Sequence, residues 1–118
     1  MLVSDVQKIL DAKCICCENL VDTEINSACG SDMMSDVLAY VKDQSVLLTG
    51  LVNPQVVRTA EMMDMPCVVF VRGKQPDDTI ISLAKDRGII LMTTPHRMFT
   101  ACGLLYQSGL KGGGCTNG

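Results

Sequence analysis

Two glycine-containing turns carry most of the residues that could hold a ligand. Each follows an apolar run and leads through a proline into a segment with helical spacing: residues 49–54 read TGLVNP and residues 72–76 read RGKQP. If both runs are strands of a parallel sheet, both turns lie at its carboxyl edge. Helix N-termini there present backbone N–H groups and a partial positive charge. The pattern therefore indicates a site for a small anionic or nucleotide-like ligand.

Side chains in and near these turns suit such a ligand. Arg72 and Lys74 supply positive charge, Asn53 supplies an amide, and polar residues at the start of an earlier helix could approach the same edge. The predicted ligand-binding set is Ser31, Asp32, Ser35, Asn53, Arg72, Gly73 and Lys74.

A plainer interpretation of the same turns stays open. Asn-Pro and Gln-Pro-Asp-Asp are good helix starts in their own right, and Gly50 and Gly73 permit turn geometry. Asp77 and Asp78 oppose an anion at the second turn. Neither turn has the G-x-x-x-x-G-K-[ST] or G-x-G-x-x-G spacing of established phosphate-binding loops.

Four of the seven cysteines lie close enough in sequence to suggest a metal or redox role: Cys14, Cys16, Cys17 and Cys29. On a regular strand, Cys14 and Cys16 point to one face and Cys17 to the other, so the four sulfurs converge poorly. The sequence does not contain a pair of C-x-x-C motifs. We therefore predict no metal and no cofactor, while a metal or redox role for these four thiols stays open.

Catalytic chemistry has little support in the sequence. His96 is the only histidine and no partner motif accompanies it. Asp32 and Asp36 stand one helical turn apart and could bind a divalent ion, but helix capping and solvent exposure explain both. We predict that the chain is not an enzyme and assign it no catalytic residue.

Composition excludes several classes of partner. The 118 residues fit one domain, the formal net charge is −3 with a pI near 4.9, and the ten basic residues are scattered. Only four residues are aromatic, which disfavours base stacking, so no nucleic acid partner is expected. The N-terminus does not resemble a signal peptide and no apolar run could span a membrane. The expected location is the cytoplasm.

Helical and strand patterns alternate along the chain. A capping box at Ser4 and Gln7 predicts a first helix ending near Lys13, and Thr94-Pro95 opens the last, with Met98, Phe99, Cys102, Leu105 and Tyr106 facing inward. Between them we expect strands at 14–17, 25–29, 46–49, 67–71 and 89–92, and helices at 31–43, 54–65 and 76–87.

The alternation predicts a three-layer α/β/α domain. Pro54 and Pro76 lie 22 residues apart, and the strand-turn-helix unit repeats in phase at that offset. Right-handed βαβ crossovers of this length give a mostly parallel sheet. We expect a single domain over residues 1–110 and a flexible glycine-rich tail at 111–118.

Four segments together resemble small free-standing members of the DRTGG domain family: SDMMSDVLAYV, LLTGLVNPQVVRTAEMMD, VVFVRGKQPDD and MFTACGLLYQSGL. The resemblance covers roughly residues 2–110. It implies a fold like the N-terminal domains of HPr kinase/phosphorylase and MurF, and a non-catalytic, commonly dimeric module. The chain also resembles the small relatives that are encoded beside iron-only hydrogenase and redox-complex subunits in anaerobes. The Asp-Arg-Thr-Gly-Gly letters themselves are absent from this chain.

The expected function is that of a regulatory or interaction module. It would form a homodimer and either sense a small ligand or dock on a metabolic or hydrogenase-associated redox protein. The alternatives are a nucleotide- or phosphate-binding accessory domain and, after that, an uncharacterised enzyme. A helix with an excess of apolar surface, such as 33–41 or 54–65, is the best candidate for the dimer contact.

Overall fold

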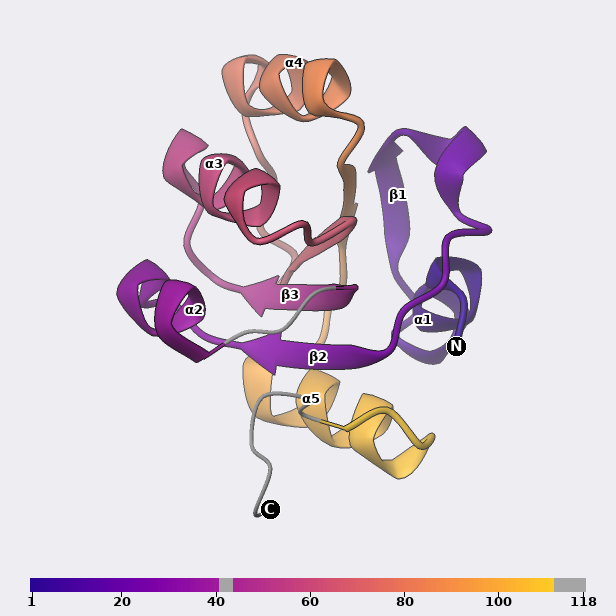
Figure 1. The fold of residues 1–118 in the computed structure, drawn as a ribbon. Coiled ribbons are helices and arrows are strands. Elements are labelled where there is room, and N and C mark those ends of the chain that lie inside the picture. The colour runs from indigo at the N-terminus through magenta and orange to yellow at the C-terminus, as the bar shows by residue number, and fades with distance from the viewer. Residues whose placement is uncertain (41–43, 112–118) are drawn as a thin grey trace.

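The computed structural model describes residues 1–40 and 44–111 and contains a five-stranded sheet with helices on both faces (Figure 1). The strand order is β1-β5-β4-β3-β2. Four strands are parallel, and β1 runs antiparallel to β5. This confirms the predicted three-layer, mostly parallel α/β architecture. The strands are β1 (Lys13–Cys16), β2 (Ser27–Gly30), β3 (Ser45–Thr49), β4 (Cys67–Phe70) and β5 (Ile90–Thr93).

The helices divide between the two faces of the sheet. They are α1 (Val3–Ile9), α2 (Met34–Tyr40), α3 (Pro54–Met62), α4 (Asp78–Arg87) and α5 (Met98–Gln107), with a short 3-10 helix η1 at Glu18–Leu20. Helices α2, α3 and α4 cover one face, and α1 and α5 lie on the other (Figure 1). All residues of β3, β4 and β5 are buried, as expected for parallel strands covered on both sides.

Alternate residues of each central strand pack into two separate hydrophobic cores. Val46 and Leu48 pack toward α1 and α5, whereas Leu47 packs toward α2 and α3. Val69 and Phe70 divide in the same way on β4. The strand pleat sends successive side chains to opposite faces, so each short apolar run contributes to both hydrophobic layers.

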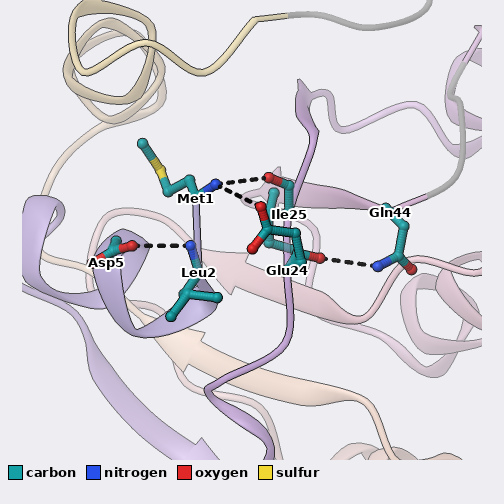
Figure 2. A network of polar contacts seen from close by, with 6 residues as sticks. All are labelled: Met1, Leu2, Asp5, Glu24, Ile25 and Gln44. Atoms are coloured by element: carbon teal, nitrogen blue, oxygen red, sulfur yellow. Dashed lines mark hydrogen bonds and ion pairs between the residues drawn. The ribbon is translucent and has the colours of Figure 1, made fainter.

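The predicted start of the first helix was wrong. The N-cap of α1 is Leu2, whose N–H donates to the Asp5 Oδ2 atom at 3.0 Å, so Ser4 lies inside the helix. Leu2 is held there because it pairs with Glu24 in an isolated β-bridge. Figure 2 shows this region: the Met1 ammonium donates to Glu24 Oε1 at 3.2 Å, and Gln44 Nε2 donates to Glu24 O at 3.0 Å. The helix ends at Ile9, before the predicted end near Lys13, and Lys13 is the first residue of β1.

Two later helices also begin downstream of the predicted prolines. Asp77 is the N-cap of α4 and accepts the Ile80 N–H at 3.0 Å, so Pro76 precedes the cap. The last helix starts at Met98, because Thr94 is tied elsewhere: its hydroxyl donates to Leu10 O at 2.6 Å. By contrast, Asn53 and Pro54 occupy the predicted N-cap and first position of α3. Gly88 ends α4 in a left-handed conformation, as predicted.

The inward face of α5 differs from the prediction. Phe99 is 90% exposed and Tyr106 is 61% exposed, whereas Ala101 and Leu105 are buried. The two aromatic residues are seven positions apart and share a helix face turned away from the sheet. Two aromatic side chains assigned to the core therefore lie on the surface.

Only the first residue of the predicted tail is described, since 112–118 lie outside the described residues. Lys111 pairs with Ser27 in a parallel bridge, and its carbonyl accepts the Ala28 N–H at 3.1 Å. The described end of the chain thus contacts the outer side of β2.

Gly30 at the end of β2 leaves no room for a side chain. A Cβ there would lie 2.6 Å from Cys102 Sγ and 3.2 Å from Met98 Sδ, both on α5. Gly30→Ala should therefore push α5 away from the sheet and lower the free energy of unfolding by about 1–3 kcal/mol, measured by urea denaturation. Adding Cys102→Ala should restore much of the loss, because it removes the closest atom.

Gly103→Ala is the matched control, because a Cβ at that exposed position of α5 meets nothing within 4 Å. It should leave stability unchanged or raise it by up to about 1 kcal/mol through better helix propensity. Equal stability of the two single variants would contradict the close packing of Gly30 against α5.

Candidate functional site

Three loops converge on Gly50 at the carboxyl edge of the parallel strands. The Asp32 carboxylate follows β2, and its Oδ1 accepts the Gly50 N–H at 2.7 Å and the Thr49 hydroxyl at 3.1 Å. Lys74 follows β4, and its Nζ donates to Gly50 O at 2.7 Å. The peptide groups on both sides of Gly50 therefore bind charged side chains from two other loops.

Arg72 completes this cluster from the β4–α4 loop. A Cβ at Gly50 would lie 2.9 Å from Arg72 Nη2 and 3.5 Å from Asp32 Oδ1. Gly50 is not among the glycines with positive φ, so its role is to leave space rather than to adopt an unusual backbone conformation. The missing side chain lets the guanidinium approach the backbone beside the carboxylate. We call Asp32, Thr49, Gly50, Arg72 and Lys74 the Gly50 cluster.

The turn that carries Arg72 is pinned to the neighbouring loop after β5. Arg72 and Gly73 both have left-handed backbones, with φ of 60° and 67°, and their N–H groups donate to His96 O and Thr94 O, each at 2.8 Å. A left-handed arginine is strained by about 1–2 kcal/mol and persists where its surroundings fix it. The N–H groups of this turn thus already have acceptors, and positive charge for an anion comes from the Arg72 and Lys74 side chains.

The structure places the predicted binding residues in two groups. Asp32, Arg72 and Lys74 meet at Gly50, with Gly73 forming the turn beside them. Asn53 is the N-cap of α3, and its buried Oδ1 has no hydrogen-bond partner among the described residues. Ser31 turns toward its own helix start, where its Oγ accepts the Met33 N–H at 3.0 Å, and Ser35 is exposed on α2.

Sequence reasoning missed the threonines that end two strands. Thr49 donates to Asp32 and also accepts the Leu51 N–H at 3.1 Å, while Thr93 Oγ1 donates to Lys74 O at 2.8 Å. Both are buried hydroxyls that fix the loops carrying the charged residues. The signal available in the sequence was a threonine at the carboxyl end of each of these two apolar runs.

The cysteines of β1 do not point as predicted. The pairing of β1 with β5 shifts register between Cys14 and Cys16, which marks a β-bulge. Cys14 consequently packs against the α1/α5 core, and Cys16 lies in the core under α2, α3 and α4. In residues 1–40 and 44–111, no group of three or more histidine, cysteine or acidic side chains is arranged to hold a metal ion.

Burial raises the pKa of the Cys16 thiol to about 11 from its ordinary 9.0, and its Sγ donates to Ile89 O at 3.6 Å. Above pH 9 the unfolded chain loses this proton while the folded chain keeps it until about pH 11. The Cys16 contribution to stability should therefore be lost as the pH rises through that window. Urea unfolding between about pH 8 and about pH 11 should show a shallower fall for Cys16→Ala than for the parent chain. Parallel pH profiles would contradict this.

The comparisons with known proteins agree with this fold. Residues 5–108 match the family model of the DRTGG domain. The chain belongs to the DRTGG domain family. No curated protein matches it. Within the described residues, no helix of this DRTGG domain has the length and apolar character to cross a membrane.

One solved structure is similar over nearly the whole chain. It contains the CBS and DRTGG domains of the regulatory region of a Clostridium perfringens pyrophosphatase, complexed with its activator, diadenosine tetraphosphate. The TM-score is 0.74 at 20% sequence identity, and the match covers 98% of this chain. This DRTGG domain spans about half the length of that solved chain, since 50% of it is covered. At this identity the likeness establishes the fold.

Proposed function

We propose that this chain is a non-catalytic regulatory domain of residues 1–110 that binds a small anionic ligand at the Gly50 cluster. The proposal rests on one observation: the side chains of Arg72 and Lys74 are both brought to Gly50 at the carboxyl edge of a parallel sheet. Open α/β sheets bind ligands at this edge, and arginine recognises phosphate and carboxylate oxygens. The pyrophosphatase regulatory region, which has the same domain fold, was solved with a polyanionic activator.

The surroundings of the cluster support an anion. Both Arg72 and Lys74 are exposed, so a ligand can reach them. Asp77, which would oppose an anion, directs its carboxylate to the Ile80 N–H at the start of its own helix. Two cations thus face one carboxylate, that of Asp32, although the whole chain carries a formal net charge of −3.

A regulatory role suits the chain better than catalysis. A cysteine nucleophile requires a lowered pKa, but burial raises the pKa of the thiols of Cys14, Cys16, Cys29, Cys67 and Cys102. The backbone carbonyl of His96 accepts the Arg72 N–H. These five thiols are therefore suited to packing rather than to nucleophilic chemistry.

Ligand binding can be tested by thermal shift and calorimetry with inorganic phosphate, acetyl phosphate, ATP and diadenosine tetraphosphate. At least one should stabilise the chain, and Arg72→Ala or Lys74→Ala should weaken its binding about tenfold by removing a charge-assisted contact. Arg58→Ala on α3 and Lys85→Ala on α4 remove equal charge at exposed sites outside the cluster and serve as controls. No stabilisation by any of the four, or unchanged binding by Arg72→Ala, would reject the site.

We propose further that the domain forms a homodimer and that the exposed face of α5 is its contact. Phe99 and Tyr106 lie seven residues apart on this face, and Phe99 is the most exposed of the large apolar side chains among the described residues. A self-complementary pairing would bury both aromatic side chains across a two-fold axis. The earlier candidates, at 33–41 and 54–65, offer Met33, Leu38 and Met62 as exposed apolar groups.

Light scattering after size exclusion should therefore give a dimer at micromolar concentration, and Phe99→Ser should convert it to a monomer. Met62→Ser is the control, since Met62 is 67% exposed on α3. A monomeric parent chain would refute the dimer, and dissociation by Met62→Ser alone would move the contact to α3. If the parent chain is monomeric, the α5 face is better explained as a contact with a metabolic or redox protein.

A further inference from the structure

We propose that Asp32 occupies the anion position of the Gly50 cluster itself and must turn away when a ligand binds. The inference rests on the proposed anion site and specifies how that site is controlled. In the free protein, the Asp32 carboxylate takes the place of a ligand oxyanion. It is therefore a competitor built into the chain, and it determines which ligands can enter.

The contacts of the carboxylate are those an oxyanion would make. Asp32 Oδ1 accepts from the Gly50 backbone N–H at 2.7 Å and from the Thr49 hydroxyl at 3.1 Å. The Arg72 guanidinium lies against the same glycine. The backbone N–H and the hydroxyl contact the carboxylate directly, and the guanidinium lies beside them at Gly50, where it would be available to a phosphate or carboxylate oxygen.

Exposure and local hydrogen bonds leave Asp32 able to move. Asp32 is exposed, whereas Thr49 and Gly50, which donate to its carboxylate, are buried. The turn before α2 does not use the Asp32 side chain, because Ser31 Oγ accepts the Met33 N–H there. The Asp32 side chain can therefore turn outward without breaking the start of α2.

Competition with a tethered carboxylate defines the ligand class. Asp32 is attached to the chain, so its effective concentration at Gly50 is high, and a singly charged free carboxylate gains little by replacing it. A phosphoryl group carries more charge and more acceptor oxygens, and it can contact Arg72 at the same time. The geometry thus favours phosphate esters or phosphate over carboxylates such as acetate.

The test compares Asp32→Asn and Asp32→Ala with Asp36→Asn by calorimetry with inorganic phosphate. Asp36 is an exposed carboxylate four residues away, so Asp36→Asn removes the same charge without vacating Gly50. Removal of the competitor should tighten the phosphate Kd about tenfold or more, with Asp32→Ala at least as tight as Asp32→Asn. Asp36→Asn should change it by about twofold or less, because exposed charges are screened.

A second measurement uses the unmodified chain. The backbone amide resonance of Gly50 should shift on addition of phosphate and remain unchanged on addition of acetate, because only phosphate displaces Asp32 from that N–H. This readout does not depend on the folding of any variant.

The possible results separate this inference from the proposed site. If phosphate binds with equal affinity to the parent chain and all three variants, Asp32 only pins the β2–α2 loop and the inference fails while the site stands. If phosphate binds to none of the four proteins and Gly50 shows no response, the inference is overturned, and the site is rejected as well if acetyl phosphate, ATP and diadenosine tetraphosphate also fail to bind. If acetate binds to Asp32→Ala as tightly as phosphate, the assignment of ligand class is wrong.

Discussion

The register of the parallel strands is the constraint on which the candidate site depends. Thr49 pairs with Phe70, and Phe70 pairs with Thr93, so β3, β4 and β5 end side by side. Gly30 of β2 is aligned with Leu48, one residue earlier on β3. Four loops therefore leave the sheet at the same level and within reach of one another. Had one strand slipped by one residue, Lys74 could not contact Gly50 as it does.

This register follows from burial rather than from the loops. The central strands are covered on both faces, and each residue fills a place in one of the two cores, so a slip would turn apolar side chains from one core toward the other. The many apolar contacts of the sheet thus hold the few polar contacts of the edge. The strained backbone of Arg72 is held in place because its N–H and that of Gly73 donate to the loop after β5.

The sheet and its carboxyl edge could be predicted because their signals are local. Apolar runs such as 46–49, followed by Asn53-Pro54, specify a buried strand and the start of a helix, and the repeat at 22 residues specifies parallel neighbours. The contacts that move helix starts are long-range: the Thr94 hydroxyl donates to Leu10 O across 84 positions of sequence. No local pattern reports such a bond, so the start of α5 and the exposure of Phe99 were not predictable.

Other parts of the site depend on small deviations from regular structure. The bulge in β1 inverts the relation between Cys14 and Cys16, and sequence alternation alone gives no warning of it. The sequence indicated that Asp32 is polar and lies near the carboxyl edge, but it did not indicate that its side chain points toward Gly50. A carboxylate before a helix suits that helix's own N–H groups, and here Ser31 takes that role while Asp32 reaches across to Gly50.

The bridge between Ser27 and Lys111 bears on how this chain behaves among copies of itself. β2 is one of the two edge strands of the sheet, and an open strand edge can recruit a strand from another molecule and start aggregation. The Lys111 carbonyl accepts a hydrogen bond from the Ala28 N–H at this edge. The Lys111 ammonium lies over the Tyr106 ring, 3.6 Å from the ring centroid. The chain thus occupies the first half of the β2 edge, which disfavours the addition of a strand from another molecule there.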